Sequence, residues 1–171
     1  MSTKESNTGF IFPNYLTLKN STLKLRSTGY RKKLMLTIYG LSFYDTDTNM
    51  DVINCSETKA ILIKMYRSFS VDKILGGMLN SVKERCQEST LKDLENLSEK
   101  IKENYESFPY KEELLMMFDF KDDSTLYLFK PVDGQYVEIA HFNDVEDLMT
   151  SILKCYFDNK SATPSLIKNL V

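Results

Sequence analysis

The chain has 171 residues, of which 42% are hydrophobic and 27% charged, and its 22 basic and 24 acidic side chains give a formal net charge of -2. This composition is typical of a globular protein and argues against a disordered chain. It lacks the positive excess of nucleic-acid-binding proteins, so no nucleic acid is expected as a partner. The length predicts a single domain over residues 9–171, preceded by a polar, flexible N-terminus over residues 1–8.

Cysteine and histidine are too few and too widely spaced for a metal site. The sequence has Cys55, Cys86 and Cys155 and one histidine, His141, whereas a structural zinc site needs about four such ligands at close spacing. We therefore expect free thiols in a reducing compartment and no cofactor. The chain shows neither the apolar segment of a signal peptide nor a run long enough to span a membrane, so a cytoplasmic protein is expected.

The strand signals fall into two blocks. "LMLTIYGLSFY", from Leu34, and "KAILIKMY", residues 59–66, show the alternation and the apolar and aromatic content of strands. Three basic residues, Arg31, Lys32 and Lys33, come directly before the first of these segments. Later, "LLMMFDF", "STLYLFK" and "QYVEIAHF" are separated by the turn signals "KDD" and "PVDG", which predicts an antiparallel meander.

Helices are predicted between the two blocks and after them. The first has apolar residues at helical spacing from Val71 to Val82, with Ser70 as a plausible N-cap. A second helix begins near Thr90, where Asp93 completes a capping pattern, and a third begins at Asn143 with Glu146 three residues on. Thr163 and Pro164 start a short terminal helix. This order of elements predicts an α+β fold.

Four phrases in this order resemble the chalcone isomerase-like family, from about Gly9 to the last residue. "GFIFP" leading to "LKLRSTGYRKK" resembles the family's L-G-x-G-x-R turn, and "IYGLSFYD" resembles its VYAIGLYVD strand. "SVDKILGGMLNSV" is similar to the helix after its third core strand, and "LKCYFDNKSATPSLIKNLV" to its closing YLGDxPVSPSLK segment. The resemblance implies an open-faced β-sandwich: a large antiparallel sheet with helices packed on one face and a ligand cleft between them.

The family's true isomerases supply a residue-by-residue test of catalysis. They use an arginine near the start of the strand block, a hydroxyl residue on the next strand, a tyrosine before the first long helix and an asparagine within it. These positions correspond here to Arg31, Tyr39, Ser70 and Gly77, or to Phe69 in place of Ser70 after a slip of one residue. Neither Phe69 nor Ser70 offers a phenol, so we do not expect an enzyme.

The family's non-catalytic, fatty-acid-binding members resemble the chain better. They keep the arginine and place a tyrosine on the next strand, and the pair holds a carboxylate while the acyl chain enters the interior. The resemblance thus implies a cleft for a fatty acid or another apolar carboxylate, bound by Arg31 and Tyr39 and bordered by Ser70, Gly77 and Met78. On one straight strand Arg31 and Tyr39 would lie about 26 Å apart, at ~3.3 Å per residue. Either the chain turns at Lys32 and Lys33 and brings them together, or Tyr39 reaches the ligand elsewhere.

Simpler interpretations remain open at each of these positions. The basic run fits a solvated surface turn as well as an anchor. Gly76 and Gly77, costly within a helix, fit either a ligand or close packing of the helix on the sheet, and Tyr39 and the methionines fit an ordinary core. An alternative function is an interaction or helper protein that keeps the fold, has a filled cleft and acts through a protein partner.

Overall fold

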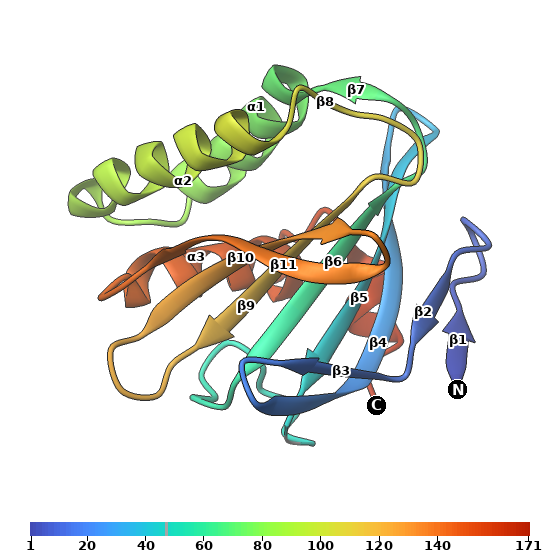
Figure 1. The fold of residues 1–171 in the computed structure, drawn as a ribbon, viewed down its shortest axis with the longest axis horizontal. Coiled ribbons are helices and arrows are strands. Elements are labelled where there is room, and N and C mark those ends of the chain that lie inside the picture. The colour runs from blue at the N-terminus through green and yellow to red at the C-terminus, as the bar shows by residue number, and fades with distance from the viewer. Residues whose placement is uncertain (47) are drawn as a thin grey trace.

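A seven-stranded antiparallel sheet forms the centre of the computed structural model, which describes residues 1–46 and 48–171 (Figure 1). The predicted meander is confirmed as three adjacent strands at one side of the sheet. The strands in spatial order are β11 (Gln135–Phe142), β10 (Thr125–Val132), β9 (Glu113–Asp119), β6 (Lys59–Met65), β5 (Leu36–Asp45), β4 (Ser21–Lys33) and β3 (Tyr15–Leu18).

Two short ribbons lie outside this sheet. Strands β7 (Phe69–Ser70) and β8 (Ser107–Phe108) pair with each other, as do β1 (Ser2–Lys4) and β2 (Ile11–Pro13). The N-terminal segment therefore differs from the loose conformation expected for residues 1–8. The carboxylate of Glu5 orders it by accepting hydrogen bonds from the amides of Asn7 and Thr8, at 2.9 and 2.6 Å, and such polar contacts leave no apolar signal in the sequence.

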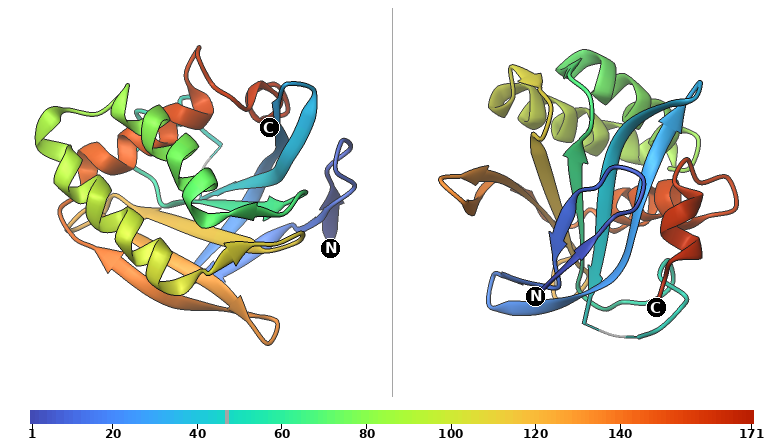
Figure 2. Two further views of the ribbon diagram at one scale, coloured as in Figure 1. Left: turned by 90° about the horizontal axis from the view of Figure 1, so that it is seen from above. Right: turned by 90° about the vertical axis from the view of Figure 1, so that its right-hand side faces the viewer.

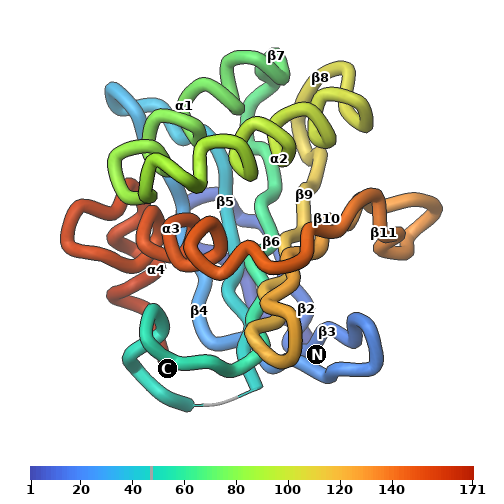
Figure 3. Tube along the Cα trace, turned by 90° about the vertical axis from the view of Figure 1, so that its left-hand side faces the viewer, coloured from blue at the N-terminus to red at the C-terminus, as the bar shows by residue number. Residues whose placement is uncertain are grey.

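The α-helices of the described residues cover the same face of the sheet (Figures 1, 2 and 3). They are α1 (Val71–Lys83), α2 (Leu91–Asn104), α3 (Glu146–Phe157) and the short α4 (Pro164–Lys168), with a 3₁₀ turn, η1 (Glu88–Thr90), before α2. This arrangement confirms the predicted α+β fold, with a large antiparallel sheet and helices on one face.

The predicted caps have mixed outcomes. Ser70 caps α1 as expected, because its hydroxyl accepts a hydrogen bond from the amide of Lys73 at 3.2 Å. Thr90 is the N-cap residue of α2 as predicted, but its side chain makes no cap hydrogen bond, and the cap predicted at Asn143 is wrong because Val145 is the N-cap residue of α3. Thr90 donates its hydroxyl to Asp147 on α3, and Asn143 accepts a hydrogen bond from Thr125 at 3.0 Å. In both cases a partner distant in sequence takes the side chain that a local cap would have used.

Apolar cores lie on both faces of the sheet. The larger core fills the space between the sheet and the helices. The second contains Phe10, Phe12, Leu16 and Leu18 from the N-terminal segment, packed against residues of the central strands such as Leu62 and Leu115. The face opposite the helices is therefore covered in part by the N-terminal strands.

Within the described residues, no helix has both the length and the apolar character needed to cross a bilayer.

Candidate functional site

The hairpin of β4 and β5 brings Arg31 and Tyr39 together. The two residues are directly paired in the antiparallel register, and paired residues of such a ladder project from the same face with neighbouring Cβ atoms. The turn expected at Lys32 and Lys33 is wrong: both residues still belong to β4, and the chain reverses at Leu34 and Met35. Leucine and methionine are not turn signals, so the sequence does not mark this position.

A bulge directly after this pair shapes the hairpin. Arg31 pairs with Tyr39 but Lys32 pairs with Thr37, so Ile38 is left over on β5. An extra residue of this kind locally bends and twists its strand. Ile38 borders the cleft beside Tyr39, as does Lys33, which alternates with Arg31 along β4.

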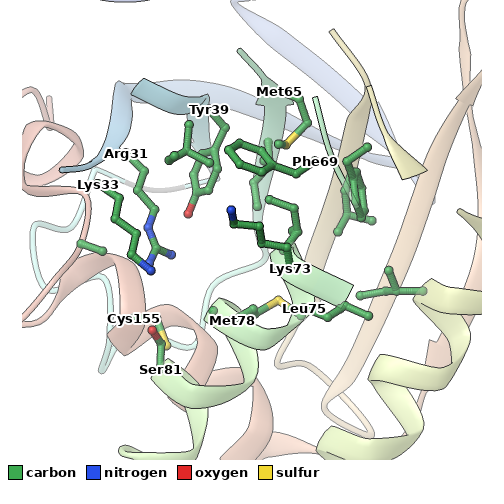
Figure 4. Close-up of a pocket in the computed structure, with 18 of the residues that line it drawn as sticks. Arg31, Lys33, Tyr39, Met65, Phe69, Lys73, Leu75, Met78, Ser81 and Cys155 are labelled. Carbon is green, nitrogen blue, oxygen red and sulfur yellow. The ribbon is translucent and has the colours of Figure 1, made fainter. Parts of the chain in front are cut away.

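The cleft lies between this hairpin, β6, α1 and α3 (Figure 4). The space among its lining atoms is about 1050 Å³ when solvent at the mouth is included, of which about 100 Å³ is available to the centre of a water molecule. Most of the lining is apolar, including Met65, Phe69, Ile74, Leu75, Met78 and Leu114. Ile74 and Met78 are only partly buried although they lie on the apolar face of α1, which shows that the protein does not fill this space itself.

Three cations converge on the cleft. Arg31 and Lys33 extend from β4 and Lys73 extends from α1, so that positive charge enters from two sides (Figure 4). Within the part of the chain that the structure describes, none of the three has a carboxylate within salt-bridge distance. The Lys73 ammonium instead lies 5.2 Å from the centre of the Phe69 ring. Glu112 is the acidic residue of the lining.

The Tyr156 hydroxyl and the Cys155 thiol beside Arg31 are uncharged at neutral pH. Burial disfavours the charge of Arg31, but a hydrogen bond with Tyr39 and the proximity of Tyr39 and Tyr156 outweigh it and raise the arginine pKa. Burial also raises the pKa of Tyr156 well above its usual range, and that of Cys155 to about 11. The site therefore presents one fixed guanidinium surrounded by hydrogen-bond donors, which suits an anion.

The structure gathers four of the five predicted site residues. Arg31, Tyr39, Gly77 and Met78 all line the cleft. A Cβ atom built on Gly77 would meet the Arg31 guanidinium at 3.9 Å, whereas one on Gly76 would meet nothing within 4 Å. No backbone therefore packs against these glycines. Ser70 lies outside the lining, because its hydroxyl caps α1.

Sequence reasoning missed Lys73, Cys155 and Tyr156. Lys73 follows the cap of α1 by one turn, and its charge resembles that of any exposed helical lysine. Tyr156 lies on the apolar face of α3, where an aromatic residue is usually part of the core. A phenol at the end of an otherwise aliphatic helix face was the available signal, and the sequence alone does not show what that hydroxyl meets.

The architecture is shared with a solved plant protein. The crystal structure of the fatty-acid binding protein AtFAP1 from Arabidopsis thaliana superposes with a TM-score of 0.78 at 17% sequence identity, covering 99% of this chain and 95% of that one. A comparison with curated protein sequences finds no match. At this identity, the likeness to AtFAP1 is a likeness of fold.

The four sequence landmarks and the sheet-and-helix architecture agree with a match at the level of the family. The model of the family described as chalcone isomerase-like matches residues 4–171. Since that match spans nearly the whole sequence, the chain belongs to the chalcone isomerase-like family.

Proposed function

We propose that this protein binds a fatty acid, or another long apolar carboxylate, in the cleft between β4, β5, α1 and α3. The observation that carries the proposal is the placement of Arg31. Its guanidinium is held beside Tyr39, has no salt bridge to a carboxylate among the described residues, and opens onto an apolar cavity. A planar guanidinium fork matches a carboxylate, and the phenol of Tyr39 adds a further donor.

The apolar walls would supply most of the binding energy. Each methylene group removed from water contributes roughly 0.8 kcal/mol, so a long chain needs only a polar anchor that fixes its orientation. Lys33 and Lys73 are exposed, and we expect them to add attraction at the mouth rather than a fixed contact. The fold that the chain shares with a fatty-acid binding protein is consistent with this use of the cleft.

We propose no isomerase activity. The position that corresponds to the isomerase tyrosine is Ser70, whose hydroxyl accepts the helix-capping hydrogen bond, and Phe69 beside it has no hydroxyl. The position of the asparagine is Gly77, which has no side chain at all.

Cys55, Cys86 and Cys155 are free thiols, and on that basis we also propose a cytoplasmic location.

Extraction of the purified protein under denaturing conditions, followed by mass spectrometry, tests the proposal. We expect about one fatty acid per chain, and Arg31→Ala should weaken uptake of added fatty acid by about 10- to 100-fold, as for a lost charged hydrogen bond. Lys32→Ala is the matched control, since it removes a neighbouring positive charge on the opposite face of β4. No fatty acid in the extract and no uptake of added fatty acid would favour the interaction-protein alternative.

A further inference from the structure

The tip of the β4–β5 hairpin carries a solvent-exposed apolar cluster. Leu34 and Met35 are each 89% exposed, and the adjoining Leu36 is 49% exposed. Single exposed apolar residues are common on protein surfaces. Here three consecutive ones occupy the end of a hairpin that projects from the edge of the sheet (Figures 1 and 2). Leu34, Met35 and Leu36 are referred to below as the apolar tip.

The turn conformation does not favour these residues. Leu34 and Met35 have φ angles of +50° and +71° and are the two residues between the paired Lys33 and Leu36, as in a type I′ turn. Such turns strongly prefer Asn-Gly, because a large side chain is strained at positive φ. Neither the turn geometry nor packing within the molecule accounts for Leu34 and Met35. Their presence therefore indicates that these side chains meet an apolar environment outside the protein.

Positive charge lies directly behind the apolar tip. Lys32 and Lys33 are exposed on opposite faces of β4, and Arg67 lies against β5 through a hydrogen bond of 3.1 Å to the carbonyl of Thr37. From Ser6 to Tyr44 the chain has six basic residues and no aspartate or glutamate. At the nearby start of α1, Asp72 is within 3.5 Å of Lys102. An apolar end with cations behind it matches the layering of an anionic bilayer, where acyl chains lie beneath phosphates.

We propose that the apolar tip inserts into the surface of an anionic phospholipid bilayer, with Lys32 and Lys33 at the level of the phosphates. The composition of the tip favours a bilayer over a protein partner, since hot spots of protein interfaces are enriched in Trp, Tyr and Arg, whereas leucine is under-represented. Lys33 belongs both to this hairpin and to the cleft lining, so docking would set the mouth of the cleft against the lipid. The docking itself needs no ligand in the cleft and goes beyond the function proposed above.

Co-sedimentation with vesicles tests this docking. The wild-type chain should bind vesicles of phosphatidylcholine and phosphatidylglycerol more tightly than vesicles of phosphatidylcholine alone. The double variant Leu34→Asn/Met35→Gly should lower the partition coefficient at least about tenfold. Because Asn-Gly suits the turn, the melting temperature of this double variant should not fall below that of the wild type. Lys32→Gln/Lys33→Gln should lower binding about fivefold per lysine and remove the preference for anionic vesicles.

Two controls make the test specific. Val137 on β11 is 45% exposed, and β10, β9 and β6 separate β11 from the β4–β5 hairpin in the sheet, so Val137→Ser should bind vesicles as the wild type does. Gly77→Leu, which fills the cleft, should also keep vesicle binding, so loss of the cleft ligand and loss of docking are distinguishable. Docking is ruled out if the wild type binds neither vesicle type, or if the Leu34→Asn/Met35→Gly variant binds vesicles as tightly as the wild type. It is also ruled out if sedimentation velocity shows instead a dimer that the same variant abolishes.

Discussion

Arg31 and Lys32 show how one strand position decides what a basic side chain can do. Arg31 faces the helices, half-buried beside Tyr39 and above apolar walls. Lys32 faces the other way, exposed, with its ammonium 5.4 Å from the ring centre of Tyr30. The alternation of a strand separates the two. The first is thus a candidate anchor for an anion, while the second is a solvated surface charge.

Gly77 is the second residue whose identity bears on the cleft. A glycine within a helix costs about 1 kcal/mol relative to alanine, and no packed backbone requires one at position 76 or 77. We infer that Gly77 keeps space open in front of Arg31. Gly77→Leu should therefore abolish fatty-acid uptake without unfolding the protein, as measured by titration with a fluorescent fatty acid and by circular dichroism.

Gly76→Leu is the matched control for this prediction, because a Cβ atom at Gly76 meets nothing within 4 Å. It should leave uptake unchanged and raise stability by roughly 0.5–1 kcal/mol through helix propensity. Equal loss of uptake in both variants would mean that the helix itself, rather than the space before Arg31, controls binding.

At the scale of elements, a side-chain clamp holds α1 against the end of α3. Arg85, just past α1, donates from Nε and Nη2 to the two carboxylate oxygens of Asp158 at 2.8 and 3.2 Å. The hydrogen bond from Arg85 is the largest cause of a lowered Asp158 pKa; partial burial opposes it and the Lys160 amide assists it. These helices form two walls of the cleft, so the clamp fixes their spacing.

The lowered pKa gives this clamp a defined pH dependence. The folded-state pKa of Asp158 lies below its unfolded value of about 4, so the stabilisation is present above that value and is lost as the pH falls through the folded-state pKa. Asp158→Asn should cost about 0.5–1 kcal/mol near neutral pH and almost nothing near pH 2, by urea unfolding. Glu103→Gln, in the exposed pair with Lys100, should change stability less at either pH.

The elements differ in how well the sequence predicted them. Strands β5, β6 and β9 to β11 and all four helices follow from apolar periodicity and turn residues. Strand β4 was missed over most of its length, because Ser27, Thr28 and Gly29 interrupt its apolar alternation. Those residues meet α4 from the far end of the chain: the Ser27 hydroxyl donates to the carbonyl of Leu166, and Asn169 donates to the carbonyl of Thr28.

The residues of the candidate site were also predicted only in part from the sequence. Arg31 and Tyr39 came from the family resemblance, but their convergence depends on a hairpin whose turn residues, Leu34 and Met35, give no turn signal. Ser70 was placed at the site by alignment alone, and its side chain serves the helix instead. Lys73 and Tyr156 reach the cleft through tertiary packing, which periodicity does not describe.

At the scale of the whole molecule, β4 and α4 join the two ends of the chain. A Cβ atom on Gly29 would lie 2.7 Å from the backbone nitrogen of Leu166 and 2.8 Å from the hydroxyl of Ser165, and that hydroxyl accepts a hydrogen bond from the amide of Tyr30. Only a residue without a side chain allows this approach.

Gly29→Ala should therefore push α4 away from the sheet and lower the stability of the whole fold. We expect a loss of about 1–3 kcal/mol, the usual cost of overpacking, measured by thermal or urea unfolding. Gly134→Ala, at the β10–β11 turn, is a useful contrast: its Cβ meets no atom within 4 Å, and its strain comes from a φ of +79° alone. A Gly29 variant as stable as the wild type would show that α4 shifts freely on β4.

The uneven distribution of charge along the chain makes the molecule electrically dipolar. Residues 6–44 carry a formal charge of +6, which leaves -8 for the rest of a chain whose total is -2. A net charge of this size says little about approach to an anionic surface, because the local field of β3 to β5 opposes that of the meander, where residues 113–142 carry a formal charge of -4. Near an anionic surface the molecule would orient with its strongly basic strands toward that surface, so encounters should begin in one orientation. The attraction should weaken as salt is added.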